Sequence, residues 1–359
     1  MDTAPHEFES RLTAALDDTP SRIPVILGPC GSGRTTALQR IGAQLRPGAA
    51  QYVDLERVTS TPERCFVRVT ADSPFAWPAP PIPPGGPGAA HLRLLAYFDG
   101  ARARDGGPAT FLLDEVLEFR AFESFPGLRR VMVDTLTALA ASPNRFVLAT
   151  RFETRALRVL RDAPDRYLVV HAPPVSVAAV AADLLQSPGL RSDQAEDAAR
   201  IIVSLSAGRA AYAAGLAKAI REPSCPVRDP IATLARLLAD GGALAGRCRY
   251  SYEIRLHRAR GYGALKAILG ILAEEEPLTL TEIAVRLGRT PGSTKDYLGW
   301  LEDVDLIRVQ RKRYTFDDPM LRVWVRLHSG CAAPDDERVS ELVQHYALAR
   351  LSSSQATHD

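Results

Sequence analysis

Disulfide and metal-binding patterns, long apolar runs and a strong net charge are all missing from this sequence of 359 residues. No C-x-x-C pair occurs, which argues against a zinc or redox motif and favours reduced thiols in the cytoplasm. The cysteines are Cys30, Cys65, Cys225, Cys248 and Cys331. The sequence contains no run of about 18 apolar residues, so it does not predict a membrane span. Met1–Asp18 carries acids where a signal peptide needs a basic segment. A net charge of +2 gives no overall electrostatic argument for binding nucleic acid.

The first half of the chain has the pattern of an α/β domain, which we place at residues 1–174. Short apolar runs alternate with stretches of helical spacing, and this alternation predicts a parallel sheet covered by helices. The expected strands are 23–27, 51–55, 111–113, 145–150 and 167–171, and the expected helices are 6–17, 35–45, 90–104 and 128–142. Residues 73–89 hold seven prolines and three glycines, which predicts an exposed irregular loop.

The second half lacks strand patterns until near its end. Alanine-rich helical spacing predicts a helical lid domain at residues 175–245. Residues 246–330 then show three helical patterns followed by two strand patterns, an order that predicts a winged helix-turn-helix. The expected elements are helices 261–275, 281–287 and 293–306 and strands 308–310 and 313–316. Residues 331–359 are expected to form a C-terminal helix and a polar tail that frays from Leu351.

A glycine-rich loop follows the first predicted strand and precedes a predicted helix. It matches the pattern Gly-x-x-x-x-Gly-Lys-[Ser/Thr] at every fixed position except one, where Arg34 replaces the lysine. The glycines let backbone N–H groups turn inward, and together with the start of the helix they form a cradle for anions. The loop therefore predicts binding of ATP or ADP through Gly28, Pro29, Cys30, Gly31, Ser32, Gly33, Arg34, Thr35 and Thr36.

Arg34 keeps the positive charge of the expected lysine but changes its shape. A lysine ammonium is a compact charge on a flexible stem, whereas a guanidinium is a bulky planar fork that can bind phosphate oxygens in pairs. The sequence leaves open whether this fork fits beside a metal ion. It therefore supports nucleotide binding and does not decide hydrolysis.

Two acids follow the third predicted strand, at the end of the run Phe-Leu-Leu-Asp-Glu in residues 111–115. Asp114 and the hydroxyl of Thr35 are expected to hold Mg²⁺, and Glu115 is expected to polarise the attacking water. Phosphoryl transfer needs little chemistry beyond such positioned charges. ATP and Mg²⁺ are therefore the expected cofactors.

Five segments together make the sequence similar to the AAA+ branch of the P-loop ATPases, and within it to archaeal-type and initiator-like ATPases near the STAND group. These segments are Pro24–Gly28, Leu113–Glu115, Arg145–Thr150, Ser206–Tyr212 and Tyr314–Trp324. The last one resembles the Tyr-x-x-x-Asp-Pro-x-x-Arg-x-Trp pattern that follows the wing in archaeal-type ATPases. The resemblance implies an AAA+-like P-loop sheet, a helical lid and a C-terminal winged helix.

The resemblance also implies roles for residues outside the loop. A sensor residue is expected at the end of the fourth strand, at Thr150 or Arg151, and a lid arginine at Arg209 near the start of a helix. Arg161 and Arg166 are candidates for an arginine finger that acts on a neighbouring subunit, although STAND-like members often lack the finger and act as switches. The expected catalytic set is Glu115, Arg34, Thr150 and Arg209.

The winged-helix segment is mildly basic, with more arginines and lysines than acids. Its predicted recognition helix and wing carry polar and cationic residues: Thr290, Ser293, Thr294, Lys295, Tyr297, Arg308, Arg311, Lys312 and Arg313. Such groups contact the phosphates and base edges of duplex DNA. Glu302, Asp303 and Asp305 follow on the same predicted helix, and winged helices also bind proteins, so double-stranded DNA and a protein both remain candidate partners.

These features lead to one main hypothesis and two alternatives. The main hypothesis is an ATP-binding AAA+/STAND-like ATPase with Mg-dependent, slow or switch-like hydrolysis, coupled to a winged helix that contacts DNA or a protein. The first alternative is a DNA-binding regulator with a vestigial phosphate loop, which Arg34 favours and the retained Asp114 and Glu115 disfavour. The second is an adaptor that docks a protein through its winged helix. A homo-oligomer fits the sequence as well, whereas a membrane partner is not expected.

Overall fold

The computed structural model describes residues 3–78, 85–186, 190–222, 229–257, 259, 261–330 and 333–355. Contacts divide the chain into two compact units. We call Thr3–Pro29 with Gly33–Pro173 the sheet unit, and Pro174–Asp359 with Cys30–Ser32 the helical unit. Cys225, Cys331, residues 79–84 of the proline-rich loop and the last four residues of the tail lie outside the described residues. None of the described helices has both the length and the apolar content that crossing a bilayer requires.

Five parallel strands form the sheet of the sheet unit, in the order β2-β3-β4-β1-β5. They are β1 (Ile23–Leu27), β2 (Ala50–Asp54), β3 (Thr110–Asp114), β4 (Arg145–Thr150) and β5 (Tyr167–His171). Every residue of β1 and β3 is buried, as expected for strands covered on both faces. Because the strands are parallel, the carboxyl ends of β1, β3 and β4 lie at one edge of the sheet, where the phosphate loop and the two acids begin.

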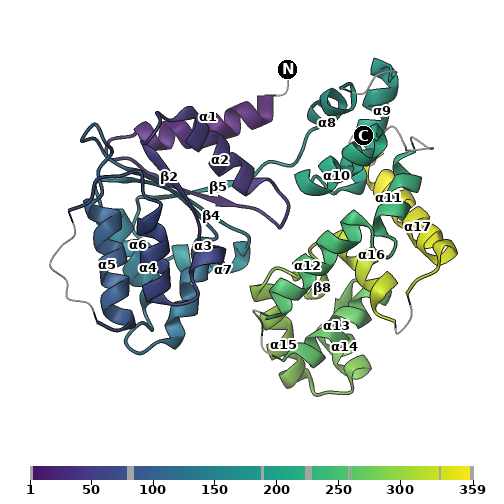
Figure 1. Cartoon of the computed structure of the whole chain (residues 1–359). Coiled ribbons are helices and arrows are strands. Elements are labelled where there is room, and N and C mark those ends of the chain that lie inside the picture. The colour runs from purple at the N-terminus through teal and green to yellow at the C-terminus, as the bar shows by residue number, and fades with distance from the viewer. Residues whose placement is uncertain are drawn as a thin grey trace. The chain divides into compact units, whose positions relative to one another are not determined.

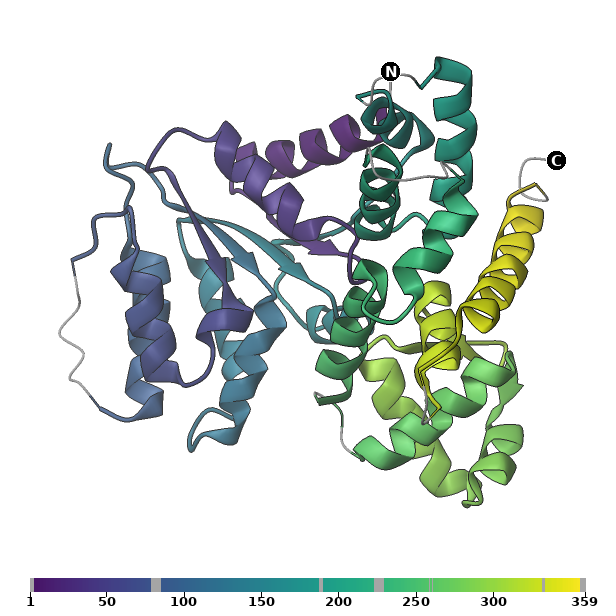
Figure 2. The same ribbon diagram turned by 45° about the vertical axis from the view of Figure 1, so that its right-hand side comes forward.

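Helices cover both faces of this sheet, with α1 and α2 on one face and α4, α5 and α6 on the other (Figures 1 and 2). The helices of the sheet unit are α1 (Thr3–Asp17), α2 (Arg34–Gln44), α3 (Leu55–Val58), α4 (Pro62–Ala71), α5 (Pro87–Gly100), the 3₁₀ helix η1 (Val116–Ser124), α6 (Val131–Ala141) and α7 (Glu153–Leu160). Helix α2 lies close to the sheet because Gly42 has no side chain. A Cβ at Gly42 would stand 3.0 Å from Cδ1 of Leu112.

An aromatic cluster fills the space between the sheet and the second helical layer. Phe111 and Phe146 on neighbouring strands stack with ring centroids 5.4 Å apart. Trp77 packs edge-on against Phe66 at 5.8 Å and Tyr97 at 5.3 Å. Aromatic pairs of this kind contribute about 0.5–1.5 kcal/mol beyond the area they bury. They therefore anchor the chain that follows α4 onto the layer below it.

The helical unit begins with a bundle of helices. Its helices outside the winged-helix elements are α8 (Val177–Leu184), α9 (Ser192–Leu205), α10 (Ala210–Arg221), α11 (Pro230–Leu238), α12 (Ala243–His257), α16 (Pro319–His328) and α17 (Asp336–Gln355). The last of them, α17, packs against α9 and α11. The hydroxyl of Tyr346 on α17 donates to the carbonyl of Leu205 at 2.6 Å. The C-terminal helix is thus packed into the bundle that contains α9 and α11.

A winged helix-turn-helix lies between α12 and α16. It comprises α13 (Tyr262–Glu274), β6 (Leu278–Thr279), α14 (Leu280–Leu287), α15 (Pro291–Asp303), β7 (Ile307–Gln310) and β8 (Arg313–Phe316), and its small antiparallel sheet has the order β6-β8-β7. A reciprocal capping box of Thr279 and Glu282 begins α14, and Gly288 ends it with a φ of 66°. Helix α15 begins at Thr290, whose side chain accepts from the N–H of Ser293. The predicted order of elements is confirmed here.

Short helices account for most differences from the sequence-based expectation. Helices α3, α4, α7 and η1 form where no helix is predicted. Helix α4 carries local start signals, since Thr61 accepts from the N–H of Arg64 and Pro62 occupies the first turn. Helix α5 starts at Pro87, inside the stretch predicted as an irregular loop, because proline suits the first turn of a helix equally well.

Two expectations near the C-terminus also change. Helix α12 spans residues 243–257, so the boundary predicted between residues 245 and 246 falls within a helix. Helix α17 continues to Gln355, so the fraying predicted from Leu351 is wrong for residues 351–355. Packing of α17 on α9 and α11 stabilises the helix up to Arg350, which bonds with Ser204 of α9, because tertiary contacts support a segment that has little helical periodicity of its own.

Candidate functional site

The phosphate loop joins the buried strand β1 to helix α2. Strand β1 ends at Leu27, and α2 begins at Arg34 after Gly33, whose φ of 93° is a conformation that glycine adopts without strain. The N-cap residue, Gly33, has no side chain with which to cap this end of α2. The first N–H groups of a helix have no acceptor inside it, so the start of α2 offers donors and a positive dipole end to an anion. This is the backbone arrangement expected from the sequence.

Thr35 and Asp114 meet at the base of the loop. The Thr35 hydroxyl donates to Oδ2 of Asp114 at 2.6 Å, and the hydroxyl of Tyr52 on β2 donates to the same oxygen at 3.0 Å. A hydroxyl beside a carboxylate is the kind of oxygen pair that binds Mg²⁺ together with phosphates and waters. These oxygens are therefore suitable ligands for the expected Mg²⁺. They come together because helix α2 packs against strand β3.

The side chain of Arg34 turns back toward its own loop. It donates to the carbonyls of Gly28 and Pro29, the latter at 2.6 Å, and Nη2 lies 3.0 Å from Oε1 of Glu115. Only 7% of the residue is exposed. The arginine that replaces the expected lysine is thus directly paired with the expected catalytic acid.

Glu115 lies between two guanidinium groups. Its Oε1 pairs with Arg34 at 3.0 Å and with Nε of Arg151 at 3.1 Å, and its Oε2 accepts the backbone N–H of Arg151 at 3.1 Å. Burial alone would raise the pKa of Glu115, but the charges of Arg34 and Arg151 outweigh it and hold the pKa below its usual range. The carboxylate is therefore charged and held at both oxygens.

Arg151 follows β4 directly and also binds a second acid. Its Nη2 contacts Oε2 of Glu56, a residue of α3, so one guanidinium bridges two carboxylates. Thr150, the last residue of β4, is fully buried, and its hydroxyl accepts the N–H of Phe152 at 3.3 Å. Of the two sensor candidates, the contacts bring Arg151 to Glu115. Glu56 and Tyr52 were not singled out from the sequence, and the only signal for them is their place near the end of a strand.

Arg209 is buried within the helical unit. It is the N-cap residue of α10, and its guanidinium pairs with Asp317 at 3.0 Å and with Asp318 at 3.5 Å. Burial lowers the pKa of Arg209, but the two aspartates raise it further than burial lowers it, so the group stays charged. The hydroxyl of Tyr212 donates to Asp318 at 2.8 Å. These contacts tie the start of α10 to the segment after the wing, and a role for Arg209 in catalysis stays a prediction.

The two arginine-finger candidates differ in their contacts. Arg166 donates to the carbonyls of Leu139, Ala140 and Ser142 at the end of α6, and to Ser21 and Asn144. It therefore closes the C-terminal end of a helix within its own chain. Arg161 lies at the end of α7 and is exposed, so it is the better candidate of the two.

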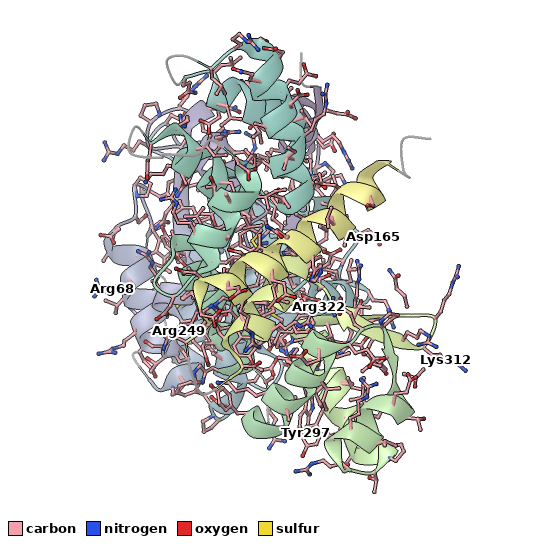
Figure 3. The ribbon with its side chains drawn as sticks, turned by 90° about the vertical axis from the view of Figure 1, so that its right-hand side faces the viewer. Arg68, Asp165, Arg249, Tyr297, Lys312 and Arg322 are labelled. Carbon is pink, nitrogen blue, oxygen red and sulfur yellow. The ribbon has the colours of Figure 1, made fainter. Side chains whose placement is uncertain are left out.

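The wing of the winged helix ends in two cations with an unusual backbone. Strands β7 and β8 are joined by Arg311 and Lys312, which have φ values of 49° and 63°. Two successive positive φ values define the tight hairpin turn that asparagine and glycine favour. Lys312 lies at the tip of this hairpin, at the periphery of the winged helix (Figure 3). Two exposed cations thus occupy positions where other residues would be less strained.

Residues 264–308 match a family of winged helix-turn-helix DNA-binding domains. Among solved structures, a Walker-type ATPase of Pyrococcus abyssi is 14% identical and covers 89% of this chain and 95% of its own, with a TM-score of 0.61. The chain has the fold of a Walker-type ATPase. More distant are the Orc1 protein of Aeropyrum pernix in complex with DNA (17% identity, 96% and 94% coverage, TM-score 0.48) and RuvB of Thermotoga maritima (15%, 87% and 91%, 0.44). No curated protein matches the sequence. In this Walker-type fold, the phosphate loop and both acids occupy the edge of the sheet described above.

Proposed function

We propose that this chain is an AAA+/STAND-like ATPase that binds ATP with Mg²⁺, hydrolyses it slowly, and uses its winged helix to contact double-stranded DNA. The observation that carries the nucleotide part is the bond between Thr35 and Asp114, which joins the start of α2 to the end of β3. A stray glycine turn has no need of a buried carboxylate at this point. Burying that carboxylate beside a hydroxyl is favourable only when both are hydrogen-bonded or hold a cation.

Each side chain of the site has one task in this proposal. Mg²⁺, when bound, would supply positive charge that offsets the charge of the nucleotide phosphates. Thr35 and Asp114 hold the ion, the N-terminus of α2 binds phosphate oxygens, and Arg34 adds a cation to them. Glu115 orients the attacking water and accepts its proton. Because Glu115 is paired with two arginines, we expect slow turnover.

Calorimetry of the full chain with ATP and Mg²⁺, followed by a phosphate-release assay, tests this function. Arg34→Ala should weaken ATP binding by about tenfold or more, since a hydrogen bond to a charged group contributes about 1.5–3 kcal/mol. Asp114→Ala should remove the dependence of binding on Mg²⁺. Arg40→Ala is the matched control on the same helix, because this side chain is 62% exposed and pairs only at the surface with Glu9. Wild-type protein that binds neither ATP nor ADP would disprove the proposal.

The wing supports DNA as the partner of the winged helix. Arg311 and Lys312 keep their cationic side chains in a turn that other residues form with less strain. Residues held in such conformations are a reason to look for function, and cations at the tip of a wing suit the phosphates of a duplex. We therefore favour DNA over a protein partner.

A gel-shift series with the full chain and a duplex of random sequence, at increasing salt, tests the DNA contact. Arg311→Ala and Lys312→Ala should each weaken binding and lower the slope of log affinity against log salt by about 0.9. Lys218→Ala, an exposed lysine of α10, is the control and should leave both unchanged. If the wild-type chain gives no shift at low salt, the adaptor that docks a protein becomes the better hypothesis.

The second candidate function is a DNA-binding regulator with a vestigial phosphate loop, and the contact of Arg34 with Glu115 favours it. Arg34 already binds the loop carbonyls and Glu115, so its guanidinium fills part of the loop. In that case Arg34→Lys should not create phosphate release. Release that appears or rises in Arg34→Lys would instead indicate a working site slowed by the shape of arginine.

A further inference from the structure

A cavity of about 720 Å³ lies within the helical unit, where helices α12, α13 and α16 pack against one another. The residues of α12 that line it recur every three or four positions from Ala245 to Glu253, so one face of that helix borders the cavity. Pockets that bind small organic molecules have volumes of about 300–1,000 Å³. The cavity therefore has room for a ligand of this kind.

Aromatic rings form one wall of the cavity. Trp324 and His328 lie one turn apart on α16 with ring centroids 5.3 Å apart, and Tyr252 of α12 lies 5.3 Å from Trp324. Nε2 of His328 donates to the carbonyl of Leu238 at 3.2 Å, which restrains the ring. Aromatic side chains bind other rings by offset or edge-on packing. This wall indicates a ligand that contains a planar ring.

Two opposite charges at the cavity are available to a ligand. The carboxylate of Glu253 accepts from the hydroxyl of Tyr262 at 2.8 Å and pairs with Lys266 at 3.3 Å, so the charges of this pair offset each other. Asp240 and Arg249 also line the cavity and are exposed. Neither of these two side chains makes a hydrogen bond or ion pair within the described part of the chain. A ligand with one anionic and one cationic group complements them.

Two glycines keep the cavity open. Gly246 on α12 and Gly270 on α13 both line it, and a Cβ at either position would meet no atom of another segment within 4 Å. Glycine inside a helix is less favourable than alanine, so close packing of helices does not account for these residues. Their lack of side chains instead leaves space that a ligand can fill.

We propose that this cavity binds a small zwitterionic aromatic compound, of which an aromatic amino acid is a simple example. The ring packs against the wall of Tyr252 and Trp324, while Arg249 attracts the anionic group and Asp240 the cationic group. The bound compound contacts α13, the first helix of the winged helix, together with α12 and α16. The proposal does not depend on ATP hydrolysis, because no residue of the phosphate loop lines the cavity.

Ligand-observed NMR titration of the full chain tests the proposal with three probes that share an indole ring. L-Tryptophan carries both charges, tryptamine only the cation and indole-3-propionate only the anion. L-Tryptophan should bind with a dissociation constant of about 1 mM or lower, as the usual ligand efficiency gives for a molecule of its size. The other two should each bind about two- to fivefold more weakly, the effect of one exposed ion pair. L-Leucine, which lacks the ring, should bind more weakly than all three.

Charge variants connect the probes to the two side chains. With Arg249→Gln, L-tryptophan and tryptamine should bind alike, because the anionic group has lost its partner. With Asp240→Asn, L-tryptophan and indole-3-propionate should bind alike. If both variants still prefer L-tryptophan as wild type does, these residues do not bind the ligand and the proposal fails.

Filling the cavity gives a second, independent test. Gly270→Leu should weaken L-tryptophan binding about tenfold or more, and its melting temperature should stay the same or rise because cavity filling commonly stabilises. Gly263→Leu is the matched control, since Gly263 lies on the same helix, has no atom of another segment within 4 Å of its Cβ position and does not line the cavity. It should bind L-tryptophan as wild type does.

Three results would overturn the proposal. In the first, wild-type chain binds none of the indole probes, or binds L-leucine as tightly as L-tryptophan. In the second, folded Gly270→Leu binds L-tryptophan as wild type does, which places the ligand elsewhere. In the third, Gly263→Leu loses binding to the same extent as Gly270→Leu. If Gly270→Leu does not fold, the Arg249→Gln and Asp240→Asn titrations decide.

Discussion

The described cysteines differ in exposure, and only Cys30 lies in the phosphate loop. Burial raises the pKa of the Cys65 thiol to about 12, and Cys65 is inaccessible to solvent. Cys248 is buried as well, whereas Cys30 is partly exposed. The thiolate is the reactive form, so a buried thiol with a raised pKa is inert. Native protein should therefore react with a maleimide at Cys30 and not at Cys65 or Cys248.

ATP with Mg²⁺ should protect Cys30 from this reaction, because phosphates bound in the loop cover it. Peptide mass spectrometry after a short maleimide pulse measures the protection. The Asp114→Ala variant should lose the part of the protection that requires Mg²⁺. Equal labelling of Cys30 with and without saturating ATP would mean that the nucleotide does not occupy this loop.

At the level of single residues, the sequence predicts only part of the candidate site. The loop, Asp114 and Glu115 follow from a local pattern of residues, and the contact of Thr35 with Asp114 agrees with that pattern. The pairing of Arg34 with Glu115, and of Arg151 with Glu56, joins residues 81 and 95 positions apart. Such contacts depend on β3 lying between β2 and β4, and nothing in the sequence specifies that order.

Among the elements, the wing hairpin gives the sharpest test because its backbone and its side chains have opposite preferences. Changing Arg311→Asn with Lys312→Gly would supply the residues that a turn with two positive φ values favours. We expect this double variant to raise the stability of the winged helix, by about 1 kcal/mol per relieved residue at the low end of the usual range. It should also weaken DNA binding.

Thermal unfolding and gel shifts on the same samples measure both effects. The hairpin β7–β8 keeps its strands unchanged, so a loss of DNA binding at higher stability points to the two cations themselves. A variant that is more stable and binds DNA as well as wild type would remove the wing from the proposed interface.

Elements with strong periodicity were easier to predict than those fixed by a few polar contacts. The strands and α13–α15 follow from apolar spacing, which is a local property. Helices α3 and η1 are short, and packing near the carboxyl edge of the sheet stabilises them, since α3 contacts β3 and η1 contacts β4. Glu56 lies on α3, which the sequence does not predict. The ion pair of Glu56 with Arg151 is therefore not predicted either.

For the whole molecule, ATP binding should appear as added stability of the native state. A ligand at a hundred times its dissociation constant stabilises by about 2.7 kcal/mol when it binds only the folded form. Urea unfolding with saturating ATP and Mg²⁺ should show this gain, and adding EDTA should reduce it. A wild-type gain of the same size with and without EDTA would contradict a metal-dependent site, whereas Asp114→Ala should give a gain that EDTA does not change.

The tryptophans make this measurement specific to one unit. Trp77 is the sole indole of the sheet unit, whereas Trp300 and Trp324 both belong to the helical unit. Its packing against Phe66 and Tyr97 places a fluorophore beside the helices that cover the sheet. Replacing Trp77 by phenylalanine removes the tryptophan fluorescence of the sheet unit and leaves both tryptophans of the helical unit. Difference spectra between the two proteins therefore record the melting of the sheet unit without any label.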